Sequence, residues 1–170
     1  MGLDTTHGCW HGAYSAFMRW RVVLAEVAGL PPLGRMEGYW STKPDDFTGG
    51  DQLSLRVIAG AMKRWAERIH EPNCLTEDSE RIMAMTRVPP IRWDCLKDRP
   101  ILHLLNHSDC EGELAWEICG PLADELETLL PALAERGDGG GHIGSFVEKT
   151  KTFIVGLRAA FAAKENVEFH

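Results

Sequence analysis

Apolar residues recur every three or four positions in four stretches of the chain, the spacing of one buried helix face. The amphipathic helices that this spacing predicts span about residues 12–28, 55–69, 113–135 and 145–164. Gly29 and the Pro31–Pro32 pair end the first helix, because neither residue type continues a helix interior. Ser145 and Glu148 form a capping box at the start of the last.

Shorter elements lie between these helices. Thr76 caps a fifth helix that extends to about Thr86. Residues 30–52 contain seven prolines and glycines, which predicts an irregular covering loop. The segments with the apolar, extended character of strands are Gly2–Thr5, Ile91–Leu96, Ile101–Leu105 and Val167–His170.

This order of elements predicts an α/β or α+β fold. We expect residues 1–170 to form a single layered domain, in which four to five helices pack around a small sheet. At 170 residues with 44% hydrophobic content, the chain is long enough to bury the core of one such domain.

Polar loops follow two of the predicted strands. If the strands at Leu3 and Leu104 are parallel neighbours in one sheet, both loops emerge at its carboxyl edge, where open α/β sheets bind ligands. Tyr14 and Arg21 lie off the apolar stripe of the first helix, which favours contact with a ligand. The candidate ligand-binding residues are Asp4, His7, Trp10, His11, Tyr14, Arg21, Asn106, His107, Asp109 and Glu111.

The same loops offer ligands for a metal. Imidazole, thiolate and carboxylate groups are those that zinc and other divalent metals accept. If a divalent metal is the cofactor, the residues that hold it are His7, Cys9, His11, His107 and Asp109. The spacing matches only half of a structural zinc signature. Carboxylates at the start of a helix also stabilise it without any function, which is the alternative for Glu111 and Glu113.

Aromatic and basic residues favour an organic ligand over a metal alone. Trp10 and Tyr14 offer flat surfaces for a base, and Arg21 offers a cation for phosphate. The first helix begins near Gly12 and presents unpaired N–H groups there. Trp20 lies on the apolar stripe, so we expect it in the core.

Composition excludes several classes of function. With 25 acidic and 18 basic residues and a formal charge of −7, the chain lacks the cationic surplus of a general nucleic-acid binder. No apolar segment is long enough to cross a membrane, and no secretory signal pattern is present. The motifs of serine hydrolases, zinc peptidases and nucleotide-binding loops are absent. An oligomer is compatible with this composition.

Five cysteines at irregular spacing, without a C-x-x-C pair, argue against a disulfide framework and favour a reducing cytoplasm. Free cysteine behaves as a small apolar residue. We therefore expect Cys74, Cys95 and Cys119 to be buried.

Three stretches carry a resemblance to a group of known proteins. They read LDTTHGCWHGAYSAFMRWR, LLNHSDCEGEL and FIVGLRAAFAAKENVEFH. The chain resembles small uncharacterised proteins encoded by tailed bacteriophages. This resemblance implies a setting in the cytoplasm of the host cell, and it assigns neither a mechanism nor catalytic residues. Small cytoplasmic phage proteins with a polar pocket, as a wider class, include inhibitors that trap nucleotide immune signals.

These observations favour a small-molecule-binding protein whose ligand, a nucleotide-derived molecule, lies between the two polar loops. In the phage setting, such a protein would sequester a nucleotide immune signal. The first alternative is a metal-dependent hydrolase acting on a phosphate-containing substrate, with Asp109 or Glu111 as general base. The second is a protein–protein inhibitor that blocks a host factor through the loop at 30–52.

Overall fold

The structure, a computed structural model, describes residues 2–36, 91–108, 111–139 and 144–170. The chain divides into two compact units. One consists of Met1–Leu30 and Leu96–His170, and the other of Pro31–Cys95. The helices predicted at 55–69 and 76–86 lie outside the described residues, as does most of the predicted loop at 30–52. The single domain over 1–170 stays a prediction.

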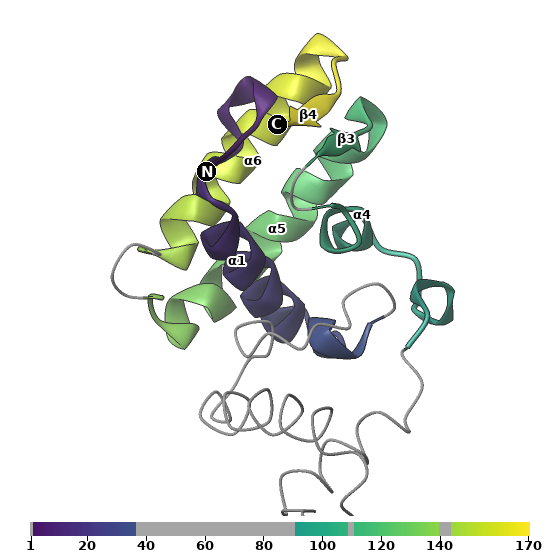
Figure 1. Cartoon of the computed structure of the whole chain (residues 1–170), viewed down its shortest axis with the longest axis vertical. Coiled ribbons are helices and arrows are strands. Elements are labelled where there is room, and N and C mark those ends of the chain that lie inside the picture. Colours follow the sequence, from purple (N-terminus) through teal and green to yellow (C-terminus); the bar gives the residue numbers. More distant parts are fainter. Residues whose placement is uncertain (1, 37–90, 109–110, 140–143) are drawn as a thin grey trace, which may run out of the picture. The chain divides into compact units, whose positions relative to one another are not determined.

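The described residues have an α+β fold with four helices and two small antiparallel sheets (Figure 1). This is the fold class that the sequence predicts. The helices are α1 (Tyr14–Val27), α4 (Ile101–Leu105), α5 (Trp116–Arg136) and α6 (Phe146–Ala163). The strands are β1 (Gly2–Asp4), β2 (His11–Ala13), β3 (Gly112–Leu114) and β4 (Val167–Phe169). Three short 3-10 helices are η1 (Thr6–Gly8), η2 (Leu33–Arg35) and η5 (Trp93–Cys95).

Each sheet is a two-stranded antiparallel pair. β1 pairs with β2, and β3 pairs with β4. A bridge between Thr5 and Phe169 then joins the two sheets, and Asp4 and His170 exchange both backbone hydrogen bonds, of 2.9 and 3.0 Å. The N- and C-terminal segments therefore lie side by side (Figure 1). The tail strand predicted from the sequence is confirmed as β4.

Helices α5 and α6 pack along each other, and α1 packs against α5. Phe17, Trp20 and Leu24 of α1 are fully buried, as the stripe of this helix predicts. The Trp20 ring lies 4.8 Å from that of Phe153 in α6, and Trp20 Nε1 donates a 2.8 Å hydrogen bond to Thr150 Oγ1. The core between α1 and α6 is therefore aromatic. The buried hydroxyl group of Thr150 has a hydrogen-bond partner there.

The prediction for the last helix is confirmed. Ser145 caps α6, accepting a hydrogen bond from the backbone N–H of Glu148 at 3.3 Å. All members of the predicted stripe are buried: Phe146, Thr150, Phe153, Leu157 and Ala160. None of the described helices is long and apolar enough to cross a membrane.

The strand predicted over Ile101–Leu105 is wrong, because this segment is the helix α4. Pro100 already has helical dihedral angles (φ −54°, ψ −37°), and proline is favourable in a first helical turn, where its missing N–H has no intrahelical partner to lose. Glu125 of α5 accepts the Ile101 N–H at 2.8 Å and so satisfies another N–H of this turn.

Two further boundaries differ from the prediction. Gly112–Leu114 forms β3, so the helix expected from residue 113 begins at Trp116 and continues through Pro121 and Pro131 as one element. The edge strand expected at Ile91–Leu96 is reduced to an isolated bridge at Ile91 followed by η5. The partners of a strand decide whether it forms, and hydrophobic spacing does not identify them.

Candidate functional site

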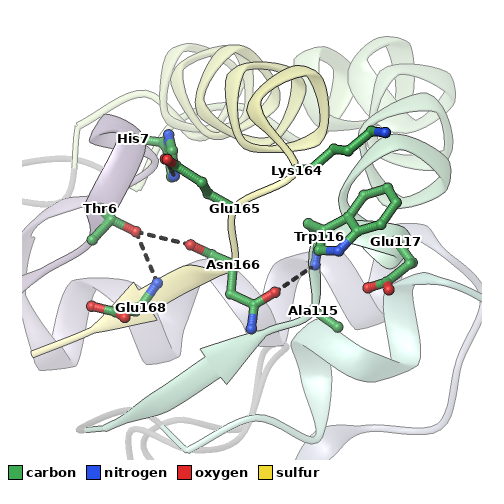
Figure 2. Close-up of a pocket in the computed structure, with 9 residues that line it drawn as sticks. All are labelled: Thr6, His7, Ala115, Trp116, Glu117, Lys164, Glu165, Asn166 and Glu168. Carbon is green, nitrogen blue, oxygen red and sulfur yellow. Dashed lines mark hydrogen bonds and ion pairs between the residues drawn. The ribbon is translucent and has the colours of Figure 1, made fainter.

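An open groove of about 710 Å³ lies where η1, the start of α5 and the turn between α6 and β4 meet (Figure 2). Its wall is polar, with one aromatic ring. The lining residues are Thr6, His7, Ala115, Trp116, Glu117, Lys164, Glu165, Asn166 and Glu168.

Thr6 and Asn166 tie the three segments together. Thr6 Oγ1 accepts a 2.9 Å hydrogen bond from the Glu168 N–H and donates one of 3.4 Å to the Asn166 carbonyl oxygen. Asn166 Oδ1 accepts the Trp116 N–H at 3.0 Å, and so caps α5, whose own N-cap residue, Ala115, has no side chain able to do so. Both links are drawn as dashed lines in Figure 2. The groove is thus held by side-chain contacts.

His7 and Lys164 both have left-handed backbone conformations. Their φ and ψ angles are 57° and 9° for His7, and 57° and 41° for Lys164. Among the described residues, no other non-glycine residue has a positive φ. A residue with a Cβ pays about 1 kcal/mol or more for this conformation. The sequence therefore retains two bulky side chains at positions that suit glycine, and both line the groove.

The ionisable side chains of the groove differ in their partners. His7 Nε2 lies 3.5 Å from Glu165 Oε2, and the imidazole is the more buried of the two side chains. Lys164 Nζ lies 6.0 Å from the centre of the Trp116 ring, and the centre of the Phe161 ring lies 6.0 Å from that of Trp116. Glu165 and Lys164 thus project from the α6–β4 turn, the first toward the His7 imidazole of η1 and the second toward the Trp116 ring of α5 (Figure 2).

Of the sequence candidates that the structure describes, only His7 lines this groove. Asp4 and His11 face each other across the β1–β2 pair and form an exposed ion pair. Trp10 is 3% exposed, and its ring packs 5.0 Å from Phe17 in the core. Tyr14 is half-buried at the start of α1.

Arg21 differs most from its expected position. The sequence placed it on the polar face of the first helix, but the residue is 1% exposed. Its guanidinium group donates hydrogen bonds to the carbonyl oxygens of Leu104, at 3.4 Å, and His107. These groups lie at and just beyond the C-terminal end of α4, where carbonyls lack helical partners and attract a cation. Arg21 therefore stabilises the fold at this point.

The second predicted loop follows α4. Asn106 and Glu111 are exposed, and Asp109 lies outside the described residues. The ring of His107 stacks on Phe169 of β4, with 4.1 Å between centroids. Because residues 101–105 are helical, the two loops do not leave parallel strands of one sheet as predicted. Both segments instead contact β4, one through the Thr5–Phe169 bridge and the other through His107.

The described residues contain no group of three or more His, Cys, Asp or Glu side chains placed to hold a metal ion. Cys9 and Cys119 are buried free thiols. Burial is the main cause that raises the pKa of Cys9 to about 12 and that of Cys119 to about 11. Cys95 is exposed, so the burial predicted for it is wrong, and Cys74 lies outside the described residues.

Most residues of the groove carry no motif in the sequence: Thr6, Trp116, Lys164, Glu165 and Asn166. One signal is present in the sequence, because the predicted last helix ends near Lys164 and the predicted tail strand begins at Val167, which defines a short turn between them. The chain matches no protein-family model, no curated protein and no solved structure.

Proposed function

We propose that the chain binds a small molecule in the groove between η1, α5 and the α6–β4 turn. The observation that carries this proposal is the pair of left-handed residues, His7 and Lys164. Strained conformations persist where the surrounding structure holds them, and they concentrate at ligand sites. Two of them, 157 positions apart in sequence, project into one groove.

A nucleotide-derived ligand fits the side chains of this groove. The Trp116 ring provides a surface for a base, and Glu117 and Glu165 provide carboxylates that accept hydrogen bonds from ribose hydroxyls. Lys164 provides an ammonium group for a phosphate. In the setting of a phage protein in the host-cell cytoplasm, the function is the sequestration of a nucleotide signal.

The test compares variants at the left-handed positions. The substitution His7→Asn keeps a residue type that tolerates this conformation, and Lys164→Gly supplies the residue that favours it. We expect the free energy of unfolding of each variant to lie within about 1 kcal/mol of the parent's value or above it. His7→Asn should bind the common ribonucleosides and their monophosphates about tenfold or more weakly in calorimetric titrations, and Lys164→Gly should bind the monophosphates about tenfold or more weakly, because each variant removes a contact worth about 1.5–3 kcal/mol.

The matched control is His11→Asn, which removes an exposed imidazole from β2, outside the groove lining. It should bind as the parent does. If His11→Asn weakens binding and His7→Asn does not, the ligand lies near the β1–β2 pair, and the proposed location is wrong.

Hydrolysis of a phosphate-containing substrate is the second candidate. The contact between His7 and Glu165 favours it, because a carboxylate that orients an imidazole is a common arrangement for a general base. Incubation with a nucleotide, denaturation and analysis of the released compound separate the candidates. Intact recovery is expected for sequestration. A changed product, formed more slowly by His7→Asn, would favour the hydrolase, and its loss with a chelator would indicate the metal-dependent form.

A further inference from the structure

Charge is unevenly distributed along the wall of the groove. Three carboxylates line it, from Glu117, Glu165 and Glu168, against the single ammonium group of Lys164. Lys164, Glu117 and Glu168 are exposed, and none of them has an ion-pair partner within 4 Å among the described residues. Their charges therefore act on whatever enters the groove.

The histidine of the groove does not balance this excess. His7 already faces Glu165 at 3.5 Å, so its imidazole and that carboxylate interact with each other first. Lys164 lies over the Trp116 ring, on the side of the groove formed by α5 (Figure 2). One anionic group of a ligand can contact Lys164, and the described lining offers no second Lys or Arg side chain for a further anionic group, only carboxylates.

From this arrangement we infer that the groove selects a ligand with a single anionic group and rejects polyanions. Lys164 and the carboxylates of Glu117 and Glu168 determine this specificity. This inference rests on the proposed function, because it names the charge class of the ligand in the same groove. In chemical terms, the groove accepts a nucleoside monophosphate or a phosphodiester, each of which offers one anionic group to Lys164. It excludes a triphosphate.

The physical basis is repulsion between like charges. Two like charges 4 Å apart repel each other measurably even in water, and more strongly at a partly desolvated surface. A triphosphate that meets two additional carboxylates should lose about tenfold or more in affinity relative to the monophosphate. The carboxylates are exposed, so salt should weaken this effect.

The experiment titrates the four common ribonucleosides, their monophosphates and their triphosphates into the full chain at low ionic strength. We expect one monophosphate to bind about tenfold or more tightly than its triphosphate. Lys164→Gln should lower the affinity for the monophosphate to that for the nucleoside. In the double variant Glu117→Gln with Glu168→Gln, the affinity for the triphosphate should come to within about threefold of the affinity for the monophosphate. The parent in 0.5 M salt should show the same change.

The matched control is Glu135→Gln, an exposed glutamate on α5 about 27 Å along the helix from Glu117. It should leave the preference for the monophosphate unchanged. Triphosphate binding that equals monophosphate binding in the parent would overturn this inference alone. If no compound of the panel binds, the nucleotide class of the proposed function and this inference both fail.

Discussion

His107 is a histidine whose surroundings disfavour its charged form. Burial is the largest cause that lowers its pKa below the ordinary value of 6.5, and the nearby Arg21 guanidinium acts in the same direction. The hydrogen bond to the Ser108 carbonyl oxygen, at 2.5 Å, acts in the opposite direction without prevailing. The His107 ring also stacks on Phe169 of β4.

The stability of the protein should therefore depend on this residue at mildly acidic pH. The pKa in the folded state is lower than in the unfolded state, so the unfolded state binds protons first as the pH falls below about 6.5. The stabilising contribution is complete above that pH and is lost below it. Urea titrations measure this effect. As the pH falls from 7.5 to 5, the free energy of unfolding of the parent should decrease by up to about 1 kcal/mol more than that of His107→Phe.

A control for this prediction is His103→Asn, which alters an exposed histidine on α4 and should keep the pH dependence of the parent. Parallel pH profiles for the parent and His107→Phe would show that His107 has the same pKa in both states. That result would contradict the pKa shift described above.

At the scale of elements, the contact between η1 and α6 depends on one glycine. A Cβ atom at position 156 would lie 2.5 Å from Cys9 Sγ and 2.8 Å from Cys9 N and Cα. Gly156 therefore lets the backbone after η1 lie directly against the helix. Through this approach, α6 holds the segment that carries Thr6 and His7 beside its own C-terminal turn.

Replacing Gly156 by Ala should destabilise the protein by about 2 kcal/mol or more, because the added methyl group meets backbone atoms that cannot rotate away. The matched control is Gly120→Ala in α5, where the added Cβ would meet the exposed ring of Phe161 at 3.0 Å. That ring can move, and alanine favours a helix, so the control should change stability by about 1 kcal/mol at most. Equal melting curves for both variants would contradict the close contact.

Sequence periodicity identified the elements that bury a long stripe. The helices α1 and α6 were predicted because residues such as Phe17 and Phe153 repeat at fixed spacing and are all buried. It failed for α4, a five-residue helix too short to show a period, and for β3, which forms because β4 arrives from the end of the chain. Short elements depend on distant partners, and these leave no local pattern.

The candidate site was harder to predict for the same reason. Residue chemistry alone predicts Arg21 and Trp10 as ligand contacts, but both side chains are buried in the interior of the fold. The groove instead depends on conformation, in the left-handed turn at Lys164, and on long-range hydrogen bonds such as that from the Trp116 N–H to Asn166 Oδ1. Neither feature follows from residue type alone.

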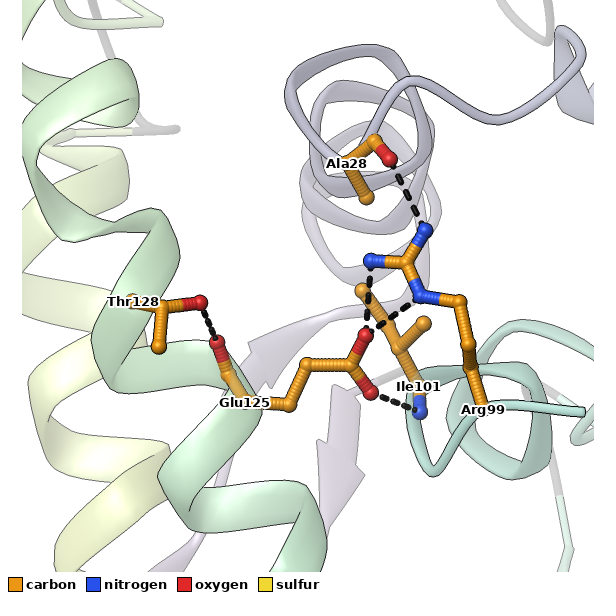
Figure 3. A network of polar contacts seen from close by, with 5 residues as sticks. All are labelled: Ala28, Arg99, Ile101, Glu125 and Thr128. Atoms are coloured by element: carbon orange, nitrogen blue, oxygen red, sulfur yellow. Dashed lines mark hydrogen bonds and ion pairs between the residues drawn. The ribbon is translucent and has the colours of Figure 1, made fainter.

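At the scale of the whole molecule, a polar network joins the two chain segments of the larger unit (Figure 3). Arg99 donates a 2.7 Å hydrogen bond to Glu125 of α5 and one of 2.9 Å to the carbonyl oxygen of Ala28, just after α1. Glu125 also accepts the N–H of Ile101. Ala28 and Arg99 lie just either side of residues 31–95 in sequence, so the network closes the larger unit where the chain leaves it and returns.

We expect a coupling of about 1–3 kcal/mol between Arg99 and Glu125 in a double-mutant cycle that combines Arg99→Met and Glu125→Gln, measured by urea unfolding. The control cycle uses Arg158 and Glu127, a pair in which both side chains are at least half exposed. Its coupling should stay below about 1 kcal/mol, since exposed pairs are screened by water. Similar couplings in the two cycles would indicate that the network of Figure 3 contributes no more than a surface pair.

The distribution of the groove along the sequence also sets when binding can begin during synthesis. Its walls come from residues 6–7, 115–117 and 164–168, so a nascent chain lacks one wall until residue 168 has left the ribosome. Contacts that are so far apart in sequence form late in folding. Translation products that stop before Lys164 would therefore have no complete groove, whatever helices they had already formed.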